Sequence, residues 1–230
     1  MIYKTVSLAE SQVGKYIDTN GDGIPEGIIF ADLAIGGSGQ WGEDNDKYHI
    51  PVIKGEFKEY VISGTYNHPI NDNKEVLTPI LDGIDRFYVM DIKKPLLRQS
   101  YLYKNAKNID LFTDTVFGSG KENTNFLYQS WKEEKYGKKS TLDVWKVVKE
   151  EIEEGWFIPS LEEWLAFLTQ INVLKNYENG VLEHFYWTSS QNRDDYLDNC
   201  SMFVPVMNNP MIVEEKMNEE ALPFRLARTI

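Results

Sequence analysis

The strongest constraint on how this chain folds is a clearly encoded helix start at Ser160. The Ser160 side chain can accept a hydrogen bond from the backbone amide of Glu163, and the Glu163 carboxylate can reach back to the amide of Ser160. This reciprocal pair is a capping box, which fixes the first turn of a helix. The apolar residues after it recur at helical spacing and predict its buried face: Leu161, Trp164, Leu165, Leu168 and Ile171.

A second apolar stripe lies just before this helix. Leu142, Trp145, Val148 and Ile152 fall on one helical face, and Gly155 is the type of residue that ends a helix. The pattern therefore predicts two helices in succession. The segment 94–139 has weak periodicity, and it is interpreted as long loops with short elements.

The rest of the chain is typical of short strands joined by turns. Residues 27–35 form the clearest early strand and run into a flexible glycine turn at 36–39. In a second strand, 86–92, Phe87 and Val89 face one side while Tyr88 and Met90 face the other. Three later strands are predicted at 184–190, 201–206 and 223–229, with Pro205 placing the middle one at an edge or a bend. Two helices among many strands predict the α+β class.

Composition excludes several classes of protein. The chain has 230 residues, 42% of them hydrophobic, so it can bury a sizeable core. A formal net charge of -12 disfavours nucleic acid as a partner. The single cysteine, Cys200, excludes an internal disulfide and a multi-cysteine metal site. No signal peptide or membrane-spanning stretch is visible, so we expect a soluble chain without membrane insertion.

Three segments of the second half occur in an order that resembles a known family. The first segment contains Trp156, Pro159, Ser160, Glu162 and Glu163, the second Tyr186, Trp187, Thr188, Ser189 and Ser190, and the third Phe224, Arg225, Leu226, Ala227 and Arg228. This order resembles the C-type-lectin-like domains of the DUF1566 group, which share a fold with the formylglycine-generating enzyme. The match is best over residues 131–230, while 1–130 resembles an elaborated N-terminal portion.

The resemblance implies a fold and a kind of function. It implies a single C-type-lectin-like domain over 1–230, with two helices packed on short twisted antiparallel sheets and with long loops. Some related domains of gut bacteria and phages resemble targets of diversity-generating retroelements, whose variable positions lie near the C-terminus on the ligand-facing surface. We therefore expect a non-catalytic ligand-binding or adhesion module, at a cell surface or on a phage particle, with a protein or glycan as its ligand.

The predicted contact residues lie between the last strands, where a rigid scaffold can vary its loops at little cost. They are mostly polar side chains suited to adaptable hydrogen bonding, with one tyrosine. The set is Gln191, Asn192, Arg193, Asp194, Asp195, Tyr196, Asn199, Asn208 and Asn209. The alternative is a solvated loop. Trp145, Trp156, Trp164 and Trp187 are interpreted as core residues, and Arg225 as a structural arginine that binds carbonyls or a carboxylate.

The segment 18–23 offers a metal site of another kind. Asp18, Asn20 and Asp22 place side-chain oxygens at alternate positions before a glycine bend, as in a calcium loop, and Glu26 stands at the ninth position. The twelfth position, where a glutamate closes such loops, is Ile29. A turn held by side-chain to backbone hydrogen bonds accounts for the same residues without calcium.

Catalytic interpretations have less support. Formylglycine-generating relatives need a cysteine pair and related sulfoxide synthases need a histidine cluster, whereas His49, His68 and His184 stand far apart in this chain. The segment 117–123 departs from a phosphate loop and is interpreted as a turn. Glu162 and Glu163 belong to the helix cap, and the calcium-dependent sugar-binding signatures of lectins are missing from the sequence. An altered enzyme of the same fold and a structural component of a surface or virion assembly stay open as rivals.

Overall fold

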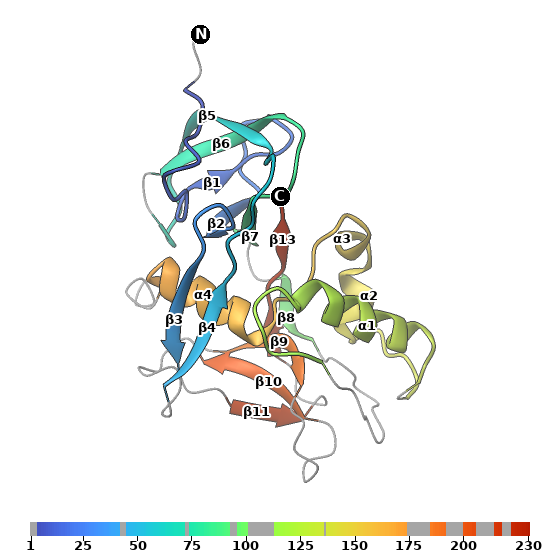
Figure 1. Cartoon of the computed structure of the whole chain (residues 1–230). Coiled ribbons are helices and arrows are strands. Elements are labelled where there is room, and N and C mark those ends of the chain that lie inside the picture. Colours follow the sequence, from blue (N-terminus) through green and yellow to red (C-terminus); the bar gives the residue numbers. More distant parts are fainter. Residues whose placement is uncertain are drawn as a thin grey trace.

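The fold was obtained as a computed structural model (Figure 1). It describes residues 4–41, 45–71, 74–92, 96–100, 113–135, 137–173, 185–191, 200–205, 214–217 and 222–230. The predicted α+β class is confirmed, because several sheets are combined with a few helices.

The largest unit is a six-stranded sheet with the order β13-β7-β2-β1-β6-β5. Its strands are β1 (Tyr16–Ile17), β2 (Gly27–Asp32), β5 (Glu59–Tyr66), β6 (Lys74–Leu81), β7 (Phe87–Asp91) and β13 (Ala227–Thr229). Only the β1–β6 pair is parallel among these neighbours. Because β13 pairs with β7, the last strand of the chain completes a sheet built from its first half.

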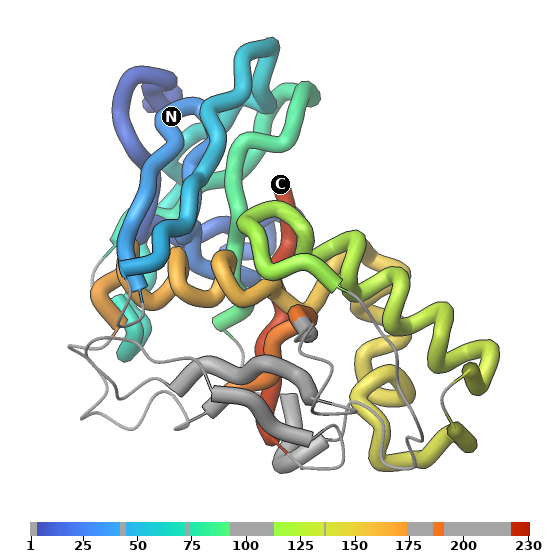
Figure 2. The backbone as a smooth tube through the Cα atoms, turned by 60° about the horizontal axis from the view of Figure 1, so that its bottom comes forward, coloured from blue at the N-terminus to red at the C-terminus, as the bar shows by residue number. Residues whose placement is uncertain are grey.

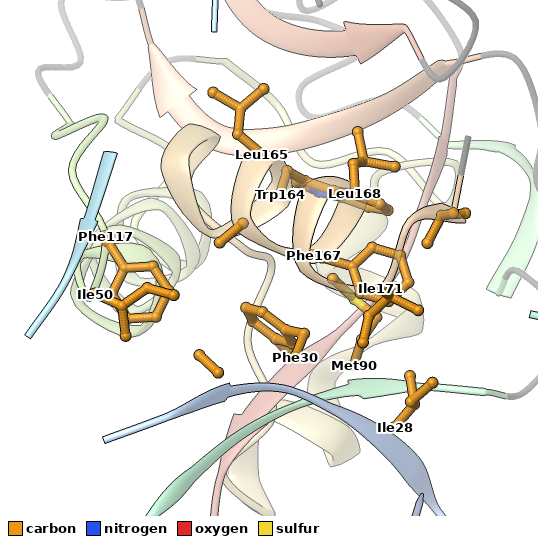
Figure 3. Close-up of a cluster of buried hydrophobic side chains, with 14 of the residues drawn as sticks. Ile28, Phe30, Ile50, Met90, Phe117, Trp164, Leu165, Phe167, Leu168 and Ile171 are labelled. Atoms are coloured by element: carbon orange, nitrogen blue, oxygen red, sulfur yellow. The ribbon is translucent and has the colours of Figure 1, made fainter. Parts of the chain in front are cut away.

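The two faces of this sheet bury different cores. Phe87 and Val89 face a smaller cluster together with Ile17, Ile29 and Leu77, which confirms the predicted alternation along β7. Met90 and the half-buried Tyr88 belong to the opposite face, with Ile28 and Phe30. In Figure 3, Phe167 of helix α4 (Leu161–Gln170) and Ile171 just after it point toward Phe30 and Met90 on this face, and the Phe167 ring meets the Phe30 ring edge-on. Aromatic and aliphatic side chains therefore join the helix to the sheet.

Helix α4 begins as the sequence predicts. The Ser160 side chain accepts from the Glu163 amide, the reciprocal bond is present, and all five residues of the predicted apolar face are buried. The helix contacts β2 of the large sheet, and it also contacts the hairpin β3 (Gly37–Trp41) and β4 (Asp46–Ile50), which reaches down to it in Figure 2. On its other side it contacts strands β9 and β10 (Figure 1).

Those strands belong to a second, three-stranded antiparallel sheet with the order β11-β10-β9. It consists of β9 (Phe185–Gln191), β10 (Cys200–Pro205) and β11 (Glu214–Met217). Strand β10 lies in the middle of this sheet, so of the two alternatives predicted from Pro205, an edge position or a bend, the edge position is wrong. Pro205 is tolerated because it is the last residue of its strand.

The helical pattern before α4 differs from the prediction in two ways. Residues 120–132 form helix α1 (Gly120–Lys132) within a segment expected to be loops. The predicted single helix after it is divided at Val148 into α2 (Val144–Val147) and α3 (Lys149–Glu153). Leu142 precedes α2 and is 47% exposed, so it does not belong to the buried stripe.

Two strand predictions also need correction. The glycine run at 36–39 is not a flexible turn, because only Gly36 turns, with φ 71°, and the next residues start β3. The predicted strand 223–229 is two strands: β12 (Leu222–Phe224) pairs with β8 (Leu96–Ser100), and β13 pairs with β7. The break falls at Arg225 and Leu226, which bind Asp91. None of the helices in the described ranges is long and apolar enough to cross a membrane.

Candidate ligand-binding surface

The predicted contact residues are carried by the three-stranded sheet. Gln191 is the last residue of β9. The other eight residues of the prediction lie outside the described ranges: Asn192, Arg193, Asp194, Asp195, Tyr196, Asn199, Asn208 and Asn209. The structure therefore describes the frame from which the two connections start.

The two connections start at opposite ends of β10. Cys200 pairs with Met217 and Ser201 with Gln191, so the β9–β10 connection leaves from this end of the sheet. Pro205 pairs with Phe185 at the other end, where the β10–β11 connection leaves. With six residues in β10, the two ends are separated by roughly 17 Å at about 3.3 Å per residue.

Three small polar residues hold the end of β9 just before Gln191. Thr188, Ser189 and Ser190 are completely buried, although each carries a hydroxyl group. The Ser190 hydroxyl accepts from the Leu161 amide at 2.9 Å and donates to the Asp114 carbonyl at 2.8 Å. This single hydroxyl thus ties the strand to the first turn of α4 and to the segment before α1.

Ser189 is held in the same way through its backbone. Its amide donates to the Pro159 carbonyl at 2.8 Å, and its carbonyl accepts from the Thr113 hydroxyl at 2.8 Å. Asn123 of α1 completes the junction, since its side-chain amide donates to the Asp114 carbonyl at 2.7 Å and its oxygen accepts from the Asp114 amide at 3.1 Å. Buried polar groups satisfied in this manner specify one geometry.

Sequence reasoning misses this junction. It treats the Thr-Ser-Ser run after Trp187 only as a family signature, and it places Thr113, Asp114 and Asn123 in loops or turns. The available signal is the run itself, because three consecutive hydroxyl residues within a buried strand need partners. Which residues supply those partners is a matter of tertiary structure.

A buried carboxylate connects the starts of α1 and α4. Glu163 Oε2 accepts from the Ser160 amide at 2.7 Å, and Oε1 accepts from the Gly118 amide at 3.2 Å. Glycine is required at Gly120, because a Cβ atom there would lie 2.1 Å from the same carboxylate and 2.8 Å from the Ser160 nitrogen. The segment 117–123 is consequently not just a turn: Gly118 turns with φ 96°, and α1 begins at Gly120.

Burial dominates the ionisation of Glu163. Desolvation raises its pKa to about 7, although the surrounding amides favour the charged form. Its neighbour Glu162 also accepts an amide hydrogen bond, from Phe117 at 3.0 Å, and burial raises the pKa of that carboxyl too. Both carboxylates thus bind the loop before α1, which supports their assignment to the helix cap.

The stability of the fold should depend on pH through Glu163. Because its pKa is about 7 in the folded chain and ordinarily 4.5, the folded state binds more protons between these values. This group's contribution to the free energy of unfolding should therefore fall as pH rises from about 4.5 to about 7, by on the order of 3 kcal/mol. Urea unfolding at several pH values should show this dependence in the wild type and not in Glu163→Gln. Glu150→Gln, at an exposed position of α3, should keep it, and an unchanged dependence in Glu163→Gln would contradict the assignment.

The structural roles predicted for the large side chains are confirmed. Trp145, Trp164 and Trp187 are completely buried, and Trp156 is nearly so. Arg225 is buried too, and its Nη1 donates to the carbonyl of Asp91 at 3.1 Å and to the carboxylate of Asp91 at 3.3 Å. These residues build the scaffold, and the loops remain the candidate binding surface.

The segment 18–23 forms a turn in which the side-chain oxygens bind backbone amides. Asp18 accepts from the amides of Gly21 and Gly23, at 2.7 and 2.9 Å. Asn20 and Asp22 each accept from the amide two residues later, at 2.9 and 2.7 Å. Both Glu26 oxygens accept from Thr19. The twelfth position, Ile29, is a buried core residue of β2 and offers no ligand.

These hydrogen bonds account for the segment as a turn, and the calcium site at Asp18, Asn20, Asp22 and Glu26 stays a prediction. Over the described ranges, no group of three or more histidine, cysteine, aspartate or glutamate side chains is placed to hold a metal ion. Calcium binding should raise the melting temperature of the wild type above its value in a chelator, and Asp22→Ala should reduce that rise. Equal melting temperatures of the wild type with and without calcium would leave only the turn.

Comparisons with known proteins provide no family for this chain. No protein-family model matches it, and neither a curated protein nor a solved structure does so.

Proposed function

We propose that this chain is a non-catalytic ligand-binding or adhesion module with a C-type-lectin-like fold. Its contact surface would be formed by Gln191 and by the connections on either side of β10. The proposed ligand is a protein or a glycan, and the proposed location is a cell surface or a phage particle. Diversification by a retroelement is part of the proposal, as an explanation of why these loops are rich in Asn, Asp and Tyr.

The observation that supports the proposal is the contrast between the end of β9 and the residues after it. Ser189 and Ser190 are held by buried hydrogen bonds to the segment before α1 and to the start of α4, and the polar contact residues begin immediately afterwards in the sequence. A rigid base with a variable loop on it is the usual construction of binding proteins that change specificity without changing fold.

Two features support the proposed C-type-lectin-like fold. The last strand, β13, pairs with β7, so the end of the chain completes a sheet built from its first half. The capped helix α4 lies between the six-stranded sheet, which β13 completes, and the three-stranded sheet, from which the predicted loops leave (Figure 1). Because a fold does not determine a function, the ligand has to be found by experiment.

The experiment is a binding screen with variants of the loops. The purified chain would be tested against immobilised glycans and surface proteins, and any ligand would be measured again with Asn192→Ala, Tyr196→Ala and Asn208→Ala. We expect at least one of these changes to weaken binding about tenfold or more, because a few residues carry most of the affinity of an interface. Lys74→Ala, at an exposed position of β6, is the control that should bind as the wild type does. Unchanged affinity in all three loop variants would refute the assignment.

The altered-enzyme alternative can be tested independently. It requires Cys200 to be reactive or a metal to be bound, so thiol labelling and elemental analysis of the purified chain decide it. A structural component of an assembly would instead form oligomers through exposed apolar surface, which light scattering would detect.

A further inference from the structure

A cavity of about 320 Å³ opens between the two ends of the large sheet. Its apolar lining comes from Pro79, Ile80 and Leu81 at the end of β6 and from Ile230 after β13. In Figure 1 the C mark, just beyond β13, lies beside the group formed by β1, β5 and β6. The cavity therefore lies where β13, at one end of the sheet order, approaches the end of β6 and the start of β5, at the other end.

Two of the apolar residues are unusually accessible. Ile80 is 50% exposed and Leu81 is 57% exposed, although both are large aliphatic side chains at neighbouring positions. A ligand that covered these side chains would remove their apolar surface from water. This burial would favour binding by about 25 cal/mol for each Å². An exposed apolar wall inside a concave site is the typical setting for the apolar part of a small ligand.

Most of the polar side chains that line the cavity already bind another group of the protein. Lys58 forms an ion pair with Asp85 at 2.6 Å, the Asp82 carboxylate accepts from the Gly83 amide, and the Thr19 hydroxyl binds Glu26. Arg228 lies over the Trp156 ring, with its guanidinium carbon 5.8 Å from the ring centre. Within the described parts of the chain, the Arg228 side chain forms no ion pair and no hydrogen bond, although its backbone belongs to the β13–β7 pair.

Arginine is suited to one type of ligand in such a place. Its planar guanidinium presents paired N–H donors that match the two oxygens of a carboxylate. Arg228 and Ile230 are two residues apart along β13 and its extension, so their side chains leave the same face of the strand. A cation and an apolar wall thus converge on one cavity.

We propose that this cavity binds a small organic carboxylate, with its carboxylate on Arg228 and its hydrocarbon part against Ile80, Leu81 and Ile230. This second site is independent of the proposed function of the loops. The negative charge of the whole chain disfavours anions in general, so binding has to come from the local pair of Arg228 and apolar surface.

The test uses octanoate as the probe, with the intact chain and calorimetric titration. We expect saturable binding with one site, and a dissociation constant at least about tenfold higher for Arg228→Gln, because a charge-assisted hydrogen-bond pair is lost. Leu81→Asp should also weaken binding. Lys149→Gln removes one positive charge at an exposed position of α3 and should leave the dissociation constant unchanged.

A comparison on the wild type covers the case in which a variant fails to fold. Octanamide has the same hydrocarbon chain and no charge, so it should bind at least about tenfold more weakly than octanoate. Equal binding of the two probes, equal binding of octanoate by Arg228→Gln and the wild type, or the lack of saturable octanoate binding would each overturn the proposal. Octanoate binding that persists in Asn192→Ala, Tyr196→Ala and Asn208→Ala would separate this site from the loops.

Discussion

Asp32→Ala is expected to destabilise the folded chain by about 3 to 5 kcal/mol, because it leaves the guanidinium of Arg86 buried without its counter-ion. Both side chains of this pair are 1% exposed. Arg86 donates from Nε and Nη2 to the two oxygens of Asp32, at 2.9 and 2.8 Å. Urea unfolding monitored by tryptophan fluorescence measures the loss.

The pair also holds the N-terminal segment on the large sheet. Arg86 donates to the carbonyls of Ser7 and Glu10, at 3.1 and 3.2 Å, and Asp32 accepts from the Gln12 amide at 3.1 Å. Removing one partner therefore disturbs more than one bond. The effect should exceed that of breaking the exposed pair Lys149–Glu153 by Glu153→Ala, which we expect to cost less than about 1 kcal/mol. Similar losses for Asp32→Ala and Glu153→Ala would contradict the role of the buried pair.

Trp164→Ala should destabilise the chain by about 3 to 5 kcal/mol, since it removes a completely buried indole from the centre of α4. The ring stacks on Tyr186 of β9, with 4.7 Å between ring centres and 28° between planes. Its Nε1 donates to the carbonyl of Trp187 at 3.2 Å. The substitution thus opens the contact between α4 and the sheet that carries the predicted loops.

Phe126→Ala is the matched control for this change. Phe126 is an aromatic residue of a helix as well, but it is 42% exposed. Its loss should cost less than about 1 kcal/mol. Chemical unfolding of both variants gives the comparison, and near-ultraviolet circular dichroism should report looser aromatic packing in Trp164→Ala alone. Equal stability of the two variants would mean that α4 does not hold the second sheet.

The elements predicted correctly are those whose signals are local. The capping box of Ser160 and Glu163 lies within four residues, and the apolar face of α4 repeats at a helical period, so neither depends on distant parts of the chain. The alternation along β7 is equally local. These patterns are enough to establish the α+β class.

The elements predicted wrongly depend on contacts between distant residues. Helix α1 buries Asn123, Thr124 and Ser130, which a hydrophobic pattern does not count as core. Thr124 exchanges hydrogen bonds with the backbone of Ile158, 34 residues later, and only tertiary structure supplies that partner. The break between β12 and β13 likewise depends on Arg225 binding Asp91, 134 residues earlier.

The candidate binding surface likewise combines features that the sequence predicts with features that only tertiary structure supplies. Composition indicates which loops could make contact, because their polar and aromatic residues come directly after a buried strand. It does not indicate how the base of the loop is fixed, since Ser190 reaches Asp114 and Leu161 across the sequence. The scaffold is thus described by the structure, and the contact residues remain a prediction.

One measurement tests the central claim most directly: the thermal unfolding midpoint of the triple variant Asn192→Ala, Tyr196→Ala and Asn208→Ala, compared with that of Ser190→Ala. Residues that serve a ligand should be dispensable for folding, so we expect the triple variant to unfold within about 2 °C of the wild type. Ser190→Ala removes a buried hydroxyl with two partners and should lower the midpoint by about 3 °C or more. A fall in the triple variant as large as that in Ser190→Ala would place these residues in the folded core and contradict a binding surface.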